Sequence, residues 1–140
     1  MPSKRSTRDE RLDRTEAADH YVLGGGRVGV AAARRLRAAG HDVGVVNELH
    51  CPAELPGRRG DPTDVGVLDD AGLSNAETVV VATRSDARNL LVAGLVRTRF
   101  DVPRVVVLTN APDRVAAVAE AGHDPVCATA ALSDALVDSV

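Results

Sequence analysis

The residues best suited to chemistry are Gly24, Gly26 and Gly29, which form a G-x-G-x-x-G pattern. The pattern follows a short apolar run and opens a segment with helical spacing. In that context the first glycine permits a tight turn, the second lets the backbone approach a pyrophosphate, and the third lets helix and strand pack closely. We therefore predict a loop that presents free N–H groups to phosphates. The alternative is a glycine-rich turn that holds no ligand.

A second signal is expected after the next strand, where a carboxylate would accept hydrogen bonds from ribose hydroxyls. The apolar run 43–46 is followed by Asn47 and Glu48. Asn47 holds the expected position, can still accept a hydrogen bond, and repels a 2′-phosphate less than an acid does. Glu48 can take the role by a shift of one residue. NAD is the first expectation, and NADP and ATP stay open.

The elements that position these residues alternate along the chain. Short Val-rich runs predict buried strands at residues 21–23, 43–46, 78–82 and 104–108. Helical spacing predicts helices at residues 27–39, 63–71, 86–99 and 129–138, and one that begins at Pro112. This alternation implies parallel strands with right-handed crossovers, and hence an α/β fold with a doubly wound parallel sheet in a single domain.

Several helix ends carry suitable residues. Ser85 can cap the helix over 86–99, and Asn110 can cap the one that Pro112 begins. Helix ends are expected at Gly40, Gly72 and Gly122. On the helix over 27–39 we expect a shared face made of Val28, Ala32, Leu36 and Ala39.

Composition excludes some classes of protein. Residues 1–19 alternate in charge and predict a flexible arm, with one globular domain over 20–140. A net charge of −3 without a basic stripe argues against a nucleic-acid binder. No apolar stretch predicts a membrane span or signal peptide, so we expect a soluble, cytoplasmic protein. Cys51 and Cys127 read as ordinary reduced thiols.

Six segments in order resemble one family. They are GGGRVG at 24–29, AGHDVGVVN at 39–47, GDPTDVGVLDDAGL at 60–73, TVVVATRSDARNLLVAGLVR at 78–97, VPRVVVLTN at 102–110 and AGHDPVCATAALSDAL at 121–136. The chain resembles the nucleotide-binding N-terminal domain of TrkA-type potassium-transport regulators, also called the RCK or KTN domain, over about residues 20–138.

The resemblance implies a Rossmann-like domain that binds NAD(H) or an adenine nucleotide, assembles as a homodimer or higher ring, and controls a membrane potassium transporter or channel. By resemblance the phosphates would be held by Gly24, Gly26, Arg27, Val28 and Gly29. The remaining assignments are Asn47 or Glu48 to the ribose, Asp61 to the adenosine, and Thr83 and Arg84 to the lining of the cleft. Asn89 also matches a family position, where it either contacts the ligand or only stabilises its turn.

The sequence departs from the family at two places. The segment between Asn47 and Gly60 contains two prolines and is too short for the usual helix and full third strand. We therefore expect a shortened second crossover and a more open adenine side. The chain also stops where a smaller ligand-sensing lobe often begins, so we expect no effector of that lobe to bind here.

Two other functions compete with the regulator. A small NAD(P)-dependent oxidoreductase needs an acid or base beside the nicotinamide, but His20, His41 and His123 are expected at the opposite end of the sheet. His50 with Cys51 and Glu54 lacks the second ligand pair of a metal site. Ser133 and Asp134 form no nucleophile motif, so we assign no catalytic or metal residue. The third hypothesis is a degenerate Rossmann scaffold without ligand.

The helix over 86–99 is the expected subunit interface. Its apolar residues surround most of its circumference: Leu90, Leu91, Ala93, Gly94, Leu95 and Val96. Burial against both the sheet and a second subunit would explain this pattern. The alternative is a central helix packed within its own domain.

Overall fold

The computed structural model describes residues 18–49 and 51–140. Its centre is a parallel sheet of six strands in the order β3-β2-β1-β4-β5-β6. The strands are β1 (His20–Leu23), β2 (Val43–Asn47), β3 (Gly57–Arg59), β4 (Thr78–Val81), β5 (Arg104–Thr109) and β6 (Asp124–Cys127). The order reverses between β1 and β4, which confirms the predicted doubly wound sheet. Most of the predicted arm, and His50, lie outside the described residues.

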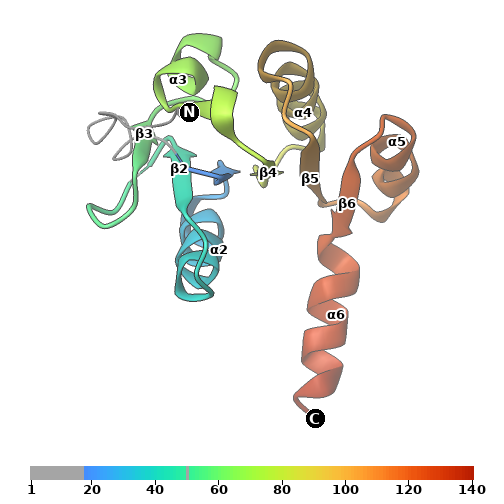
Figure 1. The fold of residues 1–140 in the computed structure, drawn as a ribbon. Helices are drawn as coiled ribbons and strands as arrows, with labels where there is room; N and C mark the ends of the chain where they lie inside the picture. The colour runs from blue at the N-terminus through green and yellow to red at the C-terminus, as the bar shows by residue number, and fades with distance from the viewer. Residues whose placement is uncertain (1–17, 50) are drawn as a thin grey trace.

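Helices cover the two faces of the sheet unequally (Figure 1). On one face lie α3 (Val65–Asp70), the short η1 (Leu73–Asn75), α4 (Asp86–Phe100) and α5 (Val115–Glu120), which follows η2 (Pro112–Arg114). On the other face α2 (Gly26–Ala38) packs against β1 and β2. The last helix, α6 (Ala128–Asp138), extends away from the body after β6.

Each face of the sheet has its own apolar core. Tyr21 and Leu23 of β1 point to the core beneath α3, α4 and α5, whereas Val22 points to the core beneath α2. This alternation is what a strand buried on both faces requires. The Tyr21 hydroxyl, fully buried, donates a 2.6 Å hydrogen bond to the Ala71 carbonyl and so ties β1 to the end of α3.

The predicted helix ends are confirmed at four of five positions. The Ser85 hydroxyl accepts a 3.1 Å hydrogen bond from the Arg88 N–H, and Gly40, Gly72 and Gly122 all have positive φ angles. The predicted cap at Asn110 is wrong, because Ala111 precedes Pro112 and the Asn110 side chain turns to the loop after β4 instead.

The shared face predicted for α2 is only partly the buried one. Leu36 packs against the core beneath α2, but Val28 is 69% exposed. The buried positions are Gly29 and Ala33. Only a glycine fits beneath the Gly24 carbonyl, so the buried residues of the first turns lie one position away from the apolar pattern.

The shortened crossover between β2 and β3 is confirmed. In the described residues between these strands there is no helix, and β3 is a three-residue edge strand paired with β2. The backbone of Pro56 closes the segment by accepting a 2.9 Å hydrogen bond from Val45 N–H. The sheet therefore keeps its third strand without the usual intervening helix.

Candidate functional site

The glycine loop lies where the strand order reverses. The Gly24 N–H donates a 2.7 Å hydrogen bond to the Val46 carbonyl, and the Ala82 N–H donates one of 2.9 Å to the Leu23 carbonyl. The ends of β2, β1 and β4 therefore meet at this loop. In parallel α/β sheets, ligands bind outside the carboxyl ends of the strands at this switch point.

Packing explains two of the glycines without any ligand. A Cβ on Gly24 would lie 2.5 Å from the Thr83 methyl carbon, so this glycine lets the loops after β1 and β4 touch. A Cβ on Gly29 would overlap the carbonyl oxygen of Gly24, so this glycine lets α2 start directly beneath the loop. Both contacts are structural requirements of the turn.

Gly26 is different, because its Cβ position is not blocked by the fold. Among the described residues, a Cβ there would meet only Leu49 Cδ1, at an ordinary 3.5 Å. The N-cap of α2 is Gly25, which has no side chain to cap the helix, and Gly29 is the first residue whose N–H bonds back into the turn, to Gly25 O at 3.0 Å. The earlier N–H groups have no acceptor within the helix. The loop thus presents N–H groups and the positive end of the helix dipole to an open space.

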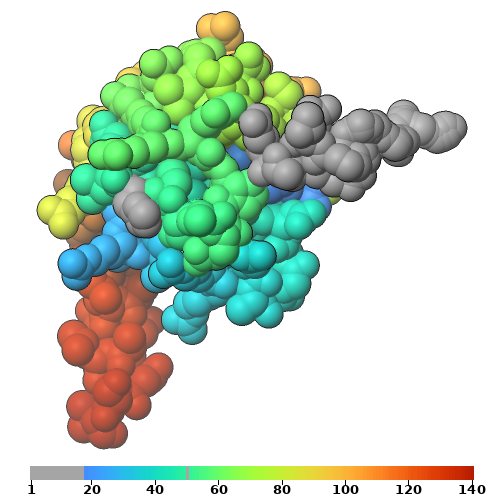
Figure 2. Space-filling model, turned by 90° about the vertical axis from the view of Figure 1, so that its left-hand side faces the viewer, coloured from blue at the N-terminus to red at the C-terminus, as the bar shows by residue number. Residues whose placement is uncertain are grey.

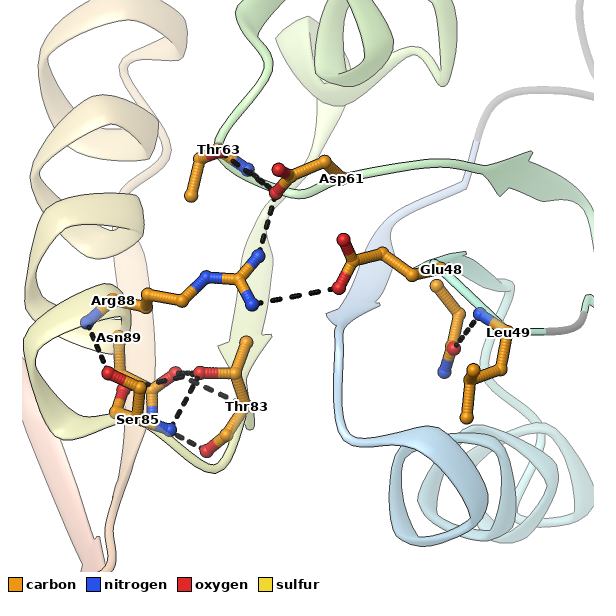
Figure 3. A network of polar contacts seen from close by, with 9 residues as sticks. Glu48, Leu49, Asp61, Thr63, Thr83, Ser85, Arg88 and Asn89 are labelled. Atoms are coloured by element: carbon orange, nitrogen blue, oxygen red, sulfur yellow. Dashed lines mark hydrogen bonds and ion pairs between the residues drawn. The ribbon is translucent and has the colours of Figure 1, made fainter.

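Thr83 and Asn89 form a buried support behind this loop (Figure 3). Asn89 Oδ1 accepts hydrogen bonds from the N–H and hydroxyl of Thr83. Asn89 Nδ2 donates to the carbonyls of Thr83 and Leu108 at 3.0 and 2.9 Å. Because Asn89 is fully buried and its amide is satisfied by the protein, it stabilises the turn, the second of the two roles that the sequence left open.

Asp86 and Asn110 hold the outer side of the same turn. Asn110 Nδ2 donates to the carbonyls of Thr83 and Arg84, each at 3.2 Å. Burial tends to raise the pKa of Asp86, but hydrogen bonds from the N–H groups of Asn110 and Ala111 outweigh it and hold that pKa below its ordinary value. The ends of β4 and β5 are therefore bound together.

Asn47 is buried at the end of β2, with 2% of its surface exposed. Its Nδ2 donates to the Gly26 carbonyl at 3.2 Å, and its Oδ1 accepts from the Leu49 N–H at 3.0 Å. The amide thus joins the glycine loop to the chain after β2. One lone pair of Asn47 Oδ1 is left to accept a hydrogen bond from a ribose hydroxyl, as the predicted ribose contact requires. That contact stays a prediction.

An ionic bridge spans the cleft beside these residues (Figure 3). Arg88, on the first turn of α4, reaches Asp61 Oδ1 at 2.7 Å and Glu48 Oε1 at 3.6 Å. Hydrogen bonds from the Thr63 N–H and hydroxyl, helped by the Arg88 charge, lower the pKa of Asp61. The bridge joins the ends of β2 and β3 to α4.

The fold thus brings the residues singled out from the sequence to one edge of the sheet. Arg27 and Arg84 are exposed there, and no interaction with another described residue engages either side chain. Sequence reasoning missed Arg88, which lies one turn into a helix and matches no motif. The sequence offered one signal for Arg88: it directly precedes Asn89 and follows Arg84 by four residues.

The opposite edge of the sheet carries the histidines. His20 begins β1, His41 lies two residues before β2, and His123 directly precedes β6, so all three are at the predicted end of the sheet. The rings of His20 and His41 lie 4.6 Å apart. Among the described residues, no group of three His, Cys, Asp or Glu side chains gathers as a metal site. Within the same residues, no helix has the length and apolar character needed to cross a membrane.

Strand order, switch-point loop and helix placement together define a Rossmann-like α/β domain. The model of the TrkA-N domain family matches residues 21–129, and the chain belongs to that family. The family resemblance inferred from the sequence motifs is confirmed.

Individual relatives agree with this assignment. The chain is 37% identical over 112 residues to the Trk system potassium uptake protein TrkA homolog of Methanothermobacter thermautotrophicus, covering 75% of this chain and 51% of that protein. Its structure is similar to the NAD(P)-binding domain of an exopolyphosphatase-related protein from Archaeoglobus fulgidus, with a TM-score of 0.72, 25% identity, and coverage of 87% and 96% of the two chains. It is also similar to the GsuK RCK domain, with a TM-score of 0.68 and 25% identity over 78% of this chain and 25% of that one. The chain spans about half the length of the known relatives it matches.

Proposed function

We propose that this chain is a nucleotide-binding regulatory domain that controls a membrane potassium transporter or channel. The observation that carries the proposal is the open space in front of Gly26, faced by N–H groups without acceptors in their own helix. Membership of the TrkA-N family, and relatives named as potassium uptake proteins, support the regulatory role.

The ligand that we propose for this edge of the sheet is an adenine nucleotide. Its phosphates lie against Gly24, Gly26 and Gly29 and against the backbone and side chain of Arg27 and Val28. Asn47 or Glu48 takes the ribose, and Asp61 lies near the adenosine. Arg84, which is exposed after the end of β4, lines the ligand site, whereas Thr83 acts mainly by holding Gly24. NAD(H) is the first ligand that we propose, with ATP, ADP and NADP as the alternatives.

In this role the nucleotide is a signal, and no chemical step is required. Binding needs only to favour one arrangement of packed domains over another, and the shift cannot exceed the difference in binding free energy. A coupling of about 1 to 3 kcal/mol is typical of such proteins. The three described histidines lie at the far edge of the sheet, which supports a regulator over an oxidoreductase.

Exposed apolar side chains on two helices support self-association as a homodimer or higher ring. On α4, Leu91 is 55% exposed while Val92, Ala93 and Val96 are buried against the sheet. On α6, Leu132 and Leu136 are 66% and 71% exposed, and no residue of the helix is buried. A second subunit covering these helices would remove that apolar area from water. The assembly then acts in the cytoplasm, at the inner membrane face beside its transporter.

The test is titration of the purified chain with NADH, NAD, NADPH, ADP and ATP, followed by calorimetry. Saturable binding without turnover supports the regulator. No binding by any nucleotide would support the degenerate scaffold, and oxidation of NADH by a carbonyl substrate would support the oxidoreductase. The oligomer is measured separately by sedimentation, where Leu91→Asp and Leu136→Asp are expected to shift the chain toward monomer.

A further inference from the structure

A pocket of about 500 Å³ opens beside the end of β2. It lies between the first half of α2 and the segment after β2, which border each other on the face drawn in Figure 2. Its walls are formed by Gly26, Arg27, Val30, Ala31, Arg34, Asn47, Leu49 and Pro52. Because Gly26 and Asn47 also belong to the nucleotide site, the pocket continues that site past the position expected for the ribose.

The wall of the pocket is mainly apolar, and the charge that its described residues carry is positive. The two charged residues among them are arginines, and Asn47 replaces the acid that would otherwise face the ribose 2′ position. The Asn47 amide is fixed by its bonds to Gly26 and Leu49, so a neutral group is held at that point. A 2′-phosphate would therefore meet no carboxylate among the described residues of the pocket wall.

Both arginines can serve an anion there. Arg27 is exposed and engages no other described residue. Arg34 pairs with Glu54 at 2.8 Å, but the two side chains are 54% and 45% exposed. Such exposed pairs contribute only about 0 to 1 kcal/mol, so Arg34 can be shared with a phosphate at small cost.

Glu54 lies beside the pocket through its pair with Arg34, and two other carboxylates near the end of β2 are compensated by an arginine of α4. Glu48 and Asp61 both pair with Arg88, at 3.6 and 2.7 Å. Their charge is therefore offset by Arg88, and neither carboxylate is among the residues that form the pocket wall.

From this arrangement we propose that the pocket binds a phosphate on the 2′-oxygen of the ribose, so that the ligand is NADP(H) in preference to NAD(H). A 2′-phosphate adds about 1.5 to 2 negative charges at neutral pH, and arginines near this position are the general means of accepting it. The inference rests on the proposed nucleotide site and selects among its ligands.

The first experiment compares matched pairs of ligands on the full chain by calorimetry: NADPH against NADH, and adenosine 2′,5′-bisphosphate against ADP. The expected result is binding at least tenfold tighter for NADPH than for NADH, with a preference that shrinks as salt is raised. Equal or tighter binding of NADH would overturn the 2′-phosphate inference and leave the proposed function standing. Absence of binding by all four ligands would overturn both.

Single substitutions test which residues cause the preference for NADPH. Arg34→Gln should weaken NADPH binding about threefold to tenfold, and the matched change Arg35→Gln, on the same helix but outside the pocket wall, should not. Asn47→Asp should reverse the preference, because it places a carboxylate beside the 2′ position. Equal losses in Arg34→Gln and Arg35→Gln would mean a general charge effect and would contradict the assignment of the pocket.

Discussion

The side-chain amide of Asn89 bonds both backbone groups of Thr83: its Oδ1 accepts from the N–H at 3.0 Å, and its Nδ2 donates to the carbonyl at 3.0 Å. Thr83 in turn contacts Gly24, so a residue of α4 sets the position of the glycine loop. The phosphate-binding loop is therefore supported from the neighbouring strand end as well as by its own turn.

Loss of this support should lower stability measurably. Asn89→Ala leaves the buried Thr83 N–H without its acceptor, whereas the Thr83 carbonyl keeps its hydrogen bond from Asn110. An unsatisfied buried group costs about 1 to 3 kcal/mol, and we expect the free energy of unfolding in urea to fall by about that amount. The exposed change Asn75→Ala serves as control and should cost less than about 0.5 kcal/mol. Equal small losses in both variants would contradict the structural role of Asn89.

The Arg88 bridge should affect binding more than folding. Arg88→Met removes the cation between Glu48 and Asp61, leaving two uncompensated carboxylates beside the anionic nucleotide. Because these groups are partly exposed, we expect less than about 1 kcal/mol of lost stability and about twofold to fivefold weaker nucleotide binding. Calorimetric titration measures the second effect, and thermal unfolding the first.

The control for that variant is Arg104→Met, which breaks the exposed pair with Asp124 at the far edge of the sheet. It should leave nucleotide affinity unchanged. The role of the bridge is refuted if both methionine variants weaken binding alike, or if Arg88→Met binds as the wild type does.

His123 should make stability depend on pH below about 7. It is 7% exposed, and its Nδ1 has no hydrogen-bond partner in the described structure. Burial, with a smaller effect of the Arg97 charge, lowers the pKa of His123. The unfolded chain then binds more protons than the folded chain below the ordinary histidine pKa of about 6.5. The free energy of unfolding should therefore fall as pH drops through that value toward the lowered one.

The check is a series of urea unfolding curves at pH 7.5, 6.5, 5.5 and 5.0 for the wild type and His123→Leu. The variant should show a smaller fall with pH, since its buried side chain cannot bind a proton. An unchanged slope would assign the pH dependence to another group.

The sequence predicted the elements whose signals are local. The apolar runs of β1, β2, β4 and β5, and the Ser85 cap of α4, depend on adjacent residues, and each lies within one or two residues of its predicted place. The short β3 was harder to place, because Gly57–Arg59 carries two exposed arginines and pairs only at the sheet edge. β3 is a strand because it pairs with β2, and the periodicity of the sequence contains no signal for that pairing.

Contacts between distant segments could not be derived from the sequence. Asn110 suits a helix cap locally, but the carbonyls of Thr83 and Arg84, 26 to 27 residues away, are its actual partners. Arg88 belongs to no motif, and its role follows from the meeting of β2, β3 and α4. The pocket at Arg34 likewise exists only because the segment after β2 folds back beside α2.

The central claim is that Gly26 faces a nucleotide, and calorimetric titration of wild type and Gly26→Ala tests it most directly. The change adds a Cβ that meets Leu49 at only 3.5 Å, in a left-handed conformation that costs about 1 to 2 kcal/mol, so the variant should fold. Gly29→Ala is the contrasting control, because its Cβ overlaps Gly24 and should destabilise the protein by about 3 kcal/mol. The account predicts saturable binding of an adenine nucleotide by the wild type and at least tenfold weaker binding by folded Gly26→Ala. Unchanged affinity in that variant would contradict it.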